Sequence, residues 1–161
     1  MKGLDIRPDE DVFVDYGSGI GAAVVMAATF PFRRVIGVEI SPEFSAIAQS
    51  LVERNRGKLC CKNIELVVAD AESYTLPTEV TVVYFYNPFR GSVLARVFEN
   101  IKASLAYAPR KLTIVFKNPI HLGSVPELEN WLIERRRFTC YNGQECVVLE
   151  ALTDGISLDQ V

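Results

Sequence analysis

The chain has 161 residues, of which 49% are hydrophobic and 23% charged, and its formal net charge is −3. This length favours a single domain, the apolar content argues against intrinsic disorder, and the small negative charge argues against a basic nucleic-acid footprint. No signal peptide or membrane span is expected. The four cysteines match no zinc or CxxC spacing, so we expect free thiols in a reducing cytoplasm and no metal site.

Short runs rich in Val and Ile alternate with longer helical patterns along the chain. Such runs are typical of strands that helices bury on both faces, and their alternation with helices predicts an α/β fold with a mostly parallel sheet. The predicted strands are residues 12–16, 34–40, 64–70, 80–86 and 111–116.

Three helices are predicted between and after these strands. The first follows Ser41, which supplies an N-cap before a first-turn proline, and its apolar stripe runs over residues 44–52. The second starts at Ser92 and ends before Pro109. The third follows a capping-box pattern at Ser124 and would end at the three arginines 135–137.

Two segments depart from this alternation. Residues 71–79 join the third strand to the fourth. A crossover that skips two strands needs about 27 Å and nine extended residues reach about 30 Å, so we expect no full helix there. At the C-terminus, residues 137–141 and 145–152 flank Asn142-Gly143, a strong hairpin-turn signal. The chain is therefore expected to end in an antiparallel hairpin.

The glycine-rich sequence at residues 15–21 directly follows the first strand. Glycines allow a tight turn and bring backbone N–H groups close to a ligand. Glu39 ends the second strand, where its carboxylate can accept hydrogen bonds from both hydroxyls of a ribose, and Asp70 ends the third, a position suited to an adenine amine. Because ligands of open α/β sheets bind at the carboxyl ends of strands, these features predict an adenosine-cofactor site. The loop also fits G-x-G-x-x-A through Ala22, so by itself it does not separate a dinucleotide from other adenosine cofactors.

Together these motifs resemble those of class I S-adenosylmethionine-dependent methyltransferases: D-x-G-x-G-x-G, VIGVEIS, VVADA and Asn87-Pro88-Phe89. The chain is similar to small bacterial members with NPF at this point, and more weakly to the non-SET histone lysine methyltransferases, which share the DxGSGxG loop and a V-x-G-V-E strand. The resemblance implies a Rossmann-like, doubly wound sheet of seven strands with a C-terminal antiparallel hairpin. It implies one methyltransferase-like domain over residues 1–161, with an extension at 1–10, a core at 11–152 and a tail at 153–161.

The resemblance also assigns the residues around S-adenosyl-L-methionine. The glycine loop would surround its methionine part, Glu39 would hold the ribose, Ile40 would pack on the adenine, and the residues after the third strand would read the adenine edge. The implied cofactor-binding residues are Asp15, Gly17, Ser18, Gly19, Glu39, Ile40, Asp70, Ala71 and Asn87.

The acceptor side of the site is predicted from the end of the fourth strand. Asn87-Pro88-Phe89 resembles the D/N-P-P-Y/F motif of methyltransferases that act on amino groups, without the second proline. In that motif an amide oxygen and a backbone carbonyl orient a planar amine, and the aromatic ring stacks on it. The alternative is that Asn87 and Pro88 simply end the strand, as Asn118-Pro119 do after the fifth. His121 is a candidate base, so the predicted catalytic residues are Asn87, Phe89 and His121.

We therefore predict a cytoplasmic S-adenosylmethionine-dependent methyltransferase that acts on an unidentified small molecule or protein, and whose acceptor atom can be an amine nitrogen. No nucleic acid or membrane is expected as a partner, and assembly into a homo-oligomer is one of the alternatives. Either the acceptor binds on an open rim, or a partner chain or a further N-terminal segment completes its pocket. Two alternatives remain: an NAD(P)-binding oxidoreductase fragment, which the match through Ala22 favours, and a non-catalytic S-adenosylmethionine-binding module.

Overall fold

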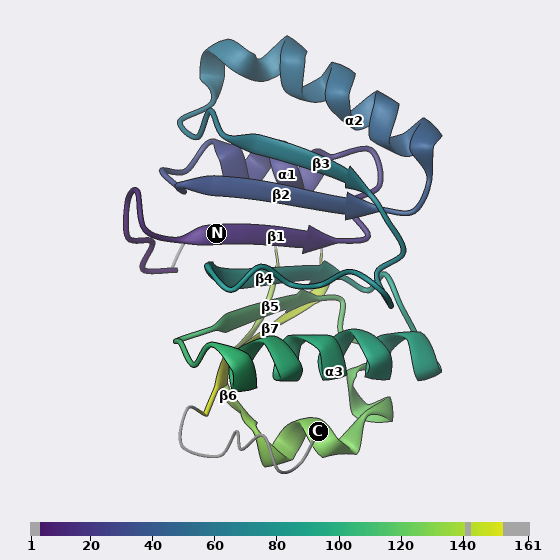
Figure 1. Ribbon diagram of the computed structural model, residues 1–161. Helices are drawn as coiled ribbons and strands as arrows, with labels where there is room; N and C mark the ends of the chain where they lie inside the picture. The colour runs from purple at the N-terminus through teal and green to yellow at the C-terminus, as the bar shows by residue number, and fades with distance from the viewer. Residues whose placement is uncertain (1–3, 141–142, 153–161) are drawn as a thin grey trace. The chain divides into compact units, whose positions relative to one another are not determined.

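The computed structural model describes residues 4–140 and 143–152 (Figure 1). Its seven-stranded sheet has the strand order β3-β2-β1-β4-β5-β7-β6. The pairs β1–β2, β2–β3 and β4–β5 are parallel, whereas β5–β7 and β6–β7 are antiparallel. The predicted Rossmann-like α/β fold with a terminal antiparallel hairpin is confirmed. The prediction of one domain over residues 1–161 stays a prediction, and its tail at 153–161 lies outside the described residues.

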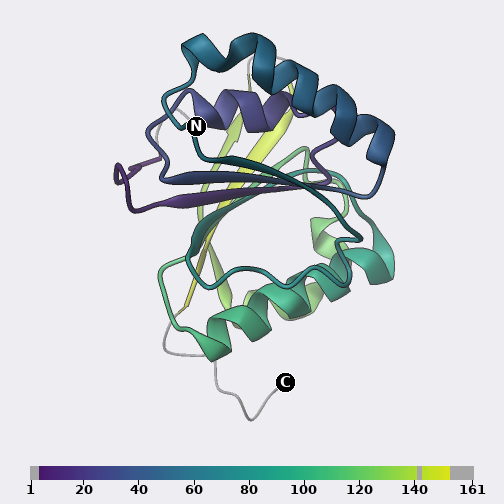
Figure 2. The same ribbon diagram turned by 45° about the horizontal axis from the view of Figure 1, so that its top comes forward.

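The chain divides into two compact units, Met1–Ala71 and Glu72–Val161. In the first unit, three parallel strands carry two helices that lie side by side on one face (Figure 2). A single 3-10 turn follows the second helix. The elements are β1 (Val12–Tyr16), α1 (Ala22–Ala28), β2 (Arg34–Glu39), α2 (Pro42–Asn55), η1 (Arg56–Lys58) and β3 (Ile64–Val68).

Helix α2 begins as predicted, because the Ser41 hydroxyl accepts a hydrogen bond from the Phe44 backbone N–H at 3.2 Å. The predicted apolar stripe is only partly buried, since Ala48 is fully buried whereas Phe44 is 48% exposed and Ile47 47% exposed. The two helices meet where Gly21 approaches Ala48, and a Cβ added at Gly21 would lie 2.7 Å from the Ala48 Cβ. The Ala48 side of α2 therefore faces the unit, and the Phe44 side faces outward.

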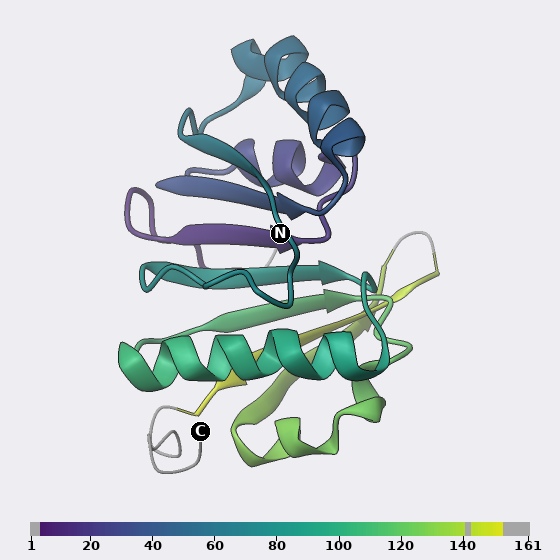
Figure 3. The same cartoon turned by 45° about the vertical axis from the view of Figure 1, so that its right-hand side comes forward.

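In the second unit, four strands carry one long helix that runs along β4 and β5 (Figure 3). Phe98 of that helix packs on Phe85 of β4 with ring centroids 5.5 Å apart, and Phe85 stacks on Phe116 of β5 at 5.1 Å. As predicted, no helix lies between β3 and β4. The elements are β4 (Val80–Tyr86), α3 (Gly91–Tyr107), β5 (Thr113–Lys117), η2 (Leu122–Ser124), η3 (Pro126–Asn130), β6 (Leu132–Thr139) and β7 (Glu145–Ala151).

The third predicted helix is wrong. After two short 3-10 turns the chain forms β6, which pairs with β7. Ser124 does not cap a helix; its hydroxyl donates to the carbonyl of His121 at 2.6 Å. Arg135 and Arg137 lie on the strand and form ion pairs with Glu150 at 2.6 Å and Glu145 at 3.3 Å of β7. Strand pairing and these cross-strand charges override the local helix signals.

The predicted hairpin turn is only partly described, because Asn142 lies outside the described residues. Gly143 has a φ of 78°, and its N–H donates to the Cys140 carbonyl at 2.9 Å. All four cysteines are free thiols. Within residues 4–140 and 143–152, no helix has the length and hydropathy needed to cross a membrane.

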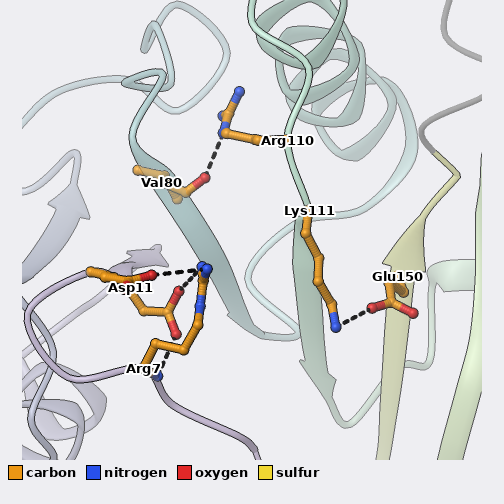
Figure 4. A network of polar contacts seen from close by, with 7 residues as sticks. Arg7, Asp11, Val80, Arg110, Lys111 and Glu150 are labelled. Atoms are coloured by element: carbon orange, nitrogen blue, oxygen red, sulfur yellow. Dashed lines mark hydrogen bonds and ion pairs between the residues drawn. The ribbon is translucent and has the colours of Figure 1, made fainter.

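Arg110 ties the segment before β4 to the end of α3. Its Nε donates to the Val80 carbonyl at 2.7 Å (Figure 4), and its Nη2 donates to the Ser104 hydroxyl at 3.0 Å. Further bonds reach the carbonyls of Ser104 at 3.1 Å, Ala108 at 2.9 Å and Pro77 at 3.4 Å. One guanidinium thus bonds to four backbone carbonyls, of which those of Ser104 and Pro77 also accept a backbone N–H.

Candidate functional site

The glycine loop between β1 and α1 turns through left-handed backbone conformations. Gly17, Gly19 and Gly21 have φ values of 71°, 53° and 83°, which L side chains rarely adopt. The N–H groups of Gly17 and Ser18 both donate to the carbonyl of Val38 in β2, at 2.9 and 3.0 Å. The predicted loop therefore lies against the carboxyl end of the neighbouring strand.

Glu39 connects this loop to the start of α2. Its Oε2 accepts a hydrogen bond from the Gly19 N–H at 2.7 Å, and its Oε1 accepts one from the Ser41 N–H at 3.0 Å. The side chain is only 9% exposed. The carboxylate is thus held at a fixed place by two backbone donors, and it in turn fixes the loop.

Asp15 is a second buried carboxyl group at the same strand ends, with 3% of the residue exposed. Burial raises the pKa of Asp15 from 3.8 to about 7, and the negative charge of Glu39 adds to this rise. At neutral pH a large fraction of Asp15 therefore carries a proton. A cation bound beside it would favour the ionised form.

Gly37 is a site residue that sequence reasoning missed. It lies opposite Asp15 in the β1–β2 register, and a Cβ added there would lie 2.9 Å from the Ser18 Oγ and 2.8 Å from the Val24 Cγ2. Only glycine lets the loop approach the strand this closely. The available signal was a glycine inside the valine- and isoleucine-rich run 34–40, since a strand glycine often marks a close backbone approach.

The residues predicted to contact adenine lie at the ends of β2 and β3. Glu39 is the register partner of Val68, and its carbonyl accepts a hydrogen bond from the Ala69 N–H at 3.0 Å. Ile40 is 66% exposed, whereas Ala71 is only 7% exposed. Asp70 is exposed. The predicted cofactor residues of the first unit thus gather at the carboxyl ends of three neighbouring strands.

Asn87 and Phe89 follow β4 in the second unit. Asn87 adopts a φ of 44°, and its Oδ1 is buried with no hydrogen-bond donor among the described residues. The Phe89 ring meets the buried Phe85 ring edge to face, with centroids 6.4 Å apart. The segment therefore holds a strained asparagine with an unmet acceptor atom, next to an aromatic ring that is anchored on the core.

The second Asn-Pro pair repeats part of this geometry after β5. Asn118 has a φ of 54°, close to that of Asn87, and its N–H donates to the Glu145 carbonyl at 2.7 Å. His121 lies three residues further on and is half-buried. Its carbonyl accepts hydrogen bonds from the Ser124 N–H at 3.0 Å and the Ser124 hydroxyl at 2.6 Å. A role for His121 as a base stays a prediction. Among the described residues, no cluster of three or more His, Cys, Asp and Glu could hold a metal ion.

The part of the chain that carries the glycine loop matches a known protein family. The family model described as histone methylation protein DOT1 matches residues 1–80, which include the glycine loop and Glu39. A search of curated protein sequences finds no match.

Many solved structures match the chain over most of its length. An RNA methyltransferase from Salinibacter ruber, in complex with S-adenosyl-L-homocysteine, is 21% identical with a TM-score of 0.64, covering 89% of this chain and 82% of that one. A SAM-dependent methyltransferase from Aquifex aeolicus is 14% identical with a TM-score of 0.72, covering 90% and 84%. A ribosomal protein L11 methylase from Lactobacillus delbrueckii subsp. bulgaricus is 13% identical with a TM-score of 0.68, covering 93% and 73%. At these identities the likeness shows the fold alone.

Proposed function

We propose that this chain, which has the class I S-adenosylmethionine-dependent methyltransferase fold, binds S-adenosylmethionine and transfers its methyl group to an acceptor. The observation that carries the proposal is the bond between the glycine loop and Glu39, in which the carboxylate accepts the Gly19 N–H at 2.7 Å. It supports a preformed site for an adenosine cofactor at the ends of β1 and β2. The match of the DOT1 family model to this half of the chain supports the same cofactor.

The residues at these strand ends fit the cofactor in hydrogen-bonding capacity, and they leave space in front of the loop. A Cβ added at Gly19 would meet no atom within 4 Å, so there is open space in front of the loop. Each Glu39 oxygen accepts one backbone N–H, and a carboxylate oxygen can accept a second bond, which leaves capacity for the ribose hydroxyls. Ile40, at 66% exposure, offers an apolar side chain to a flat base.

When bound, S-adenosylmethionine supplies a methyl group already activated by its sulfonium, which an acceptor nucleophile takes as the S–CH3 bond breaks and its electron pair stays on sulfur. The protein therefore has to align an acceptor, exclude water and let any acceptor proton leave. In our proposal Glu39 orients the ribose end and the Asp15 carboxyl lies near the cationic methionine end. The positive charge at that end would favour the ionised form of Asp15, and a small shift suffices at neutral pH because the pKa of Asp15 is about 7.

We propose further that the acceptor atom is an amine nitrogen. The Asn87 Oδ1 is a hydrogen-bond acceptor that is buried and has no donor in the described part of the chain. Leaving such an atom unmet costs about 1–3 kcal/mol, and an N–H of the acceptor would recover that cost. Asn87 would orient the amine, Phe89 would stack on it, and His121 is the candidate to receive the proton that leaves.

Calorimetric titration and a transfer assay test the proposal. S-adenosylhomocysteine is expected to bind, and NADH is not expected to bind. Label from methyl-labelled cofactor is expected to appear in a component of a cell extract. Tight NADH binding with no response to S-adenosylhomocysteine would instead support an oxidoreductase fragment. Binding of S-adenosylhomocysteine without label transfer under any condition would support a non-catalytic module.

A further inference from the structure

A cation lies at the carboxyl end of β5, beside the strand that leads to Asn87. Lys117 and Tyr86 are the last residues of β5 and β4, and they are partners in the parallel register. The Lys117 Nζ lies 4.5 Å from the centroid of the Tyr86 ring. The Tyr86 hydroxyl donates to the Gln144 Oε1 at 2.8 Å, which holds the ring in place. Tyr86 is nevertheless 47% exposed, so this end of the strand pair is open to a ligand.

The Lys117 ammonium has no carboxylate partner among residues 4–140 and 143–152. An acidic residue does lie near its strand partner Cys146, since Glu145 is the preceding residue of β7. That carboxylate is paired with Arg137, at 3.3 Å. By contrast, Lys111, two residues before the start of β5, pairs with Glu150 at 2.9 Å (Figure 4). Within the described residues, the positive charge of Lys117 is therefore not neutralised by a carboxylate.

The residues that carry the cation and the unmet oxygen lie at the carboxyl ends of two neighbouring strands. Asn87 directly follows Tyr86 and Asn118 directly follows Lys117, so the two asparagines leave paired strands side by side. The backbones of adjacent strands are about 4.8 Å apart, so one small molecule can reach side chains from both strand ends. The Asn87 Oδ1 calls for an N–H donor and the Lys117 Nζ calls for an anion. A single ligand that carries both groups would satisfy both.

We propose that the methyl acceptor is a small amine that also carries an anionic group, either a carboxylate or a phosphate. This inference rests on the proposed function. The Asn87 Oδ1 accepts a hydrogen bond from the amine, and Lys117 forms an ion pair with the anion. The Tyr86 ring holds the ammonium in position by a cation–π contact. The half-buried position of Lys117 makes the ion pair stronger than one at a fully exposed lysine, because solvent screens it less.

Matched acceptors test this assignment. The protein is incubated with methyl-labelled S-adenosylmethionine and ω-amino acids of increasing length, their carboxamides, the corresponding ω-aminoalkyl phosphates and the ω-amino alcohols. At least one anionic series is expected to be methylated with a KM about fivefold or more below that of its neutral counterpart, the ratio expected for one partly exposed ion pair. The carboxylate and phosphate series distinguish the two sources of the anion.

Variants of Lys117 test whether this side chain causes the preference for anionic over neutral acceptors. Lys117→Met is expected to raise the KM for the anionic acceptor to that of the neutral one. Lys117→Arg, which keeps the charge, is expected to retain the preference. Lys111→Met is the matched control, because Lys111 lies two residues before β5 and is already paired with Glu150. It is expected to behave as the wild type.

Three results would overturn the inference: equal KM values for anionic and neutral acceptors, a preference that survives in Lys117→Met, or labelling of none of these amines. In each case binding of S-adenosylhomocysteine and labelling of an extract show separately whether the proposed function holds. Without cofactor binding the proposed function itself fails. With binding and with label in an acceptor of another class, only the assignment of a small anionic amine fails.

Discussion

The carboxylate of Glu39 is the contact whose removal tests the candidate site most directly. In Glu39→Ala the Gly19 and Ser41 N–H groups lose their acceptors, which lie at 2.7 and 3.0 Å in the wild type. Because the loop and the start of α2 are both held by this one side chain, the variant is expected to unfold more easily even without cofactor. Glu39→Gln keeps one acceptor oxygen and should show a smaller effect.

The size of the effect follows from these two bonds. Hydrogen bonds to a charged group contribute about 1.5–3 kcal/mol each, and unpaired buried N–H groups add a desolvation cost. Ser41 is half-buried, so water can replace part of its bond. We therefore expect Glu39→Ala to lower the free energy of unfolding by about 2–4 kcal/mol, and Glu39→Gln by about half of that. If Glu39 also holds the ribose, Glu39→Ala should weaken S-adenosylhomocysteine binding by a further ~1.5–3 kcal/mol, roughly 10- to 150-fold.

Urea denaturation of the ligand-free protein and calorimetric titration measure the two effects separately. Glu43→Gln is the matched control, because Glu43 is an exposed acid in the first turn of α2 and its loss should shift the unfolding curve far less. A Glu39→Ala protein within about 0.5 kcal/mol of the wild type would refute the inference that this carboxylate fixes the loop. Unchanged cofactor affinity in a folded variant would remove Glu39 from the cofactor site.

Three further perturbations test other parts of the structure. The pKa of Asp15 is raised from 3.8 to about 7, so between these pH values the folded protein keeps a proton that the unfolded chain releases. The free energy of unfolding of the wild type, relative to that of Asp15→Asn, should therefore fall as pH rises over this range. Chemical denaturation at pH 4 to 8 measures this difference, and parallel profiles of the two proteins would contradict the raised pKa. Arg110→Met should lower the free energy of unfolding by about 2–4 kcal/mol, because several backbone carbonyls lose a charged donor; a wild-type denaturation midpoint would show that water replaces these bonds. Gly37→Ala should cost about 1–3 kcal/mol and weaken S-adenosylhomocysteine binding, because its Cβ would lie 2.9 Å from the Ser18 Oγ; full stability with full affinity would mean that the loop yields without cost.

Sequence patterns predicted most of the fold because they are local. All strands except β6 carry runs of apolar residues rich in Val and Ile, and α3 has apolar residues at helical spacing, with Leu94, Phe98 and Ile101 all buried. The third helix failed for the opposite reason. Residues 132–139 have helix-compatible composition, and only pairing with β7, a segment that follows a turn, makes them a strand. The hairpin signal indicated that partner only for residues 137–141, and no pattern extended the strand back to Leu132.

For the candidate site, residue types and chain order determined by themselves that a glycine loop, Glu39 and Asp70 end three neighbouring strands. They could not show that Glu39 bonds to Gly19, that Gly37 leaves room for Ser18, or that Asp15 shares a buried position with Glu39. They also left Lys117 unremarked, because its meaning depends on the Tyr86 ring beside it on another strand. Motifs record which groups a site contains, since the chemistry of each side chain is fixed by its type. Only the tertiary structure decides which groups meet, because contacts between strands depend on register and on the burial of residues far apart in the chain.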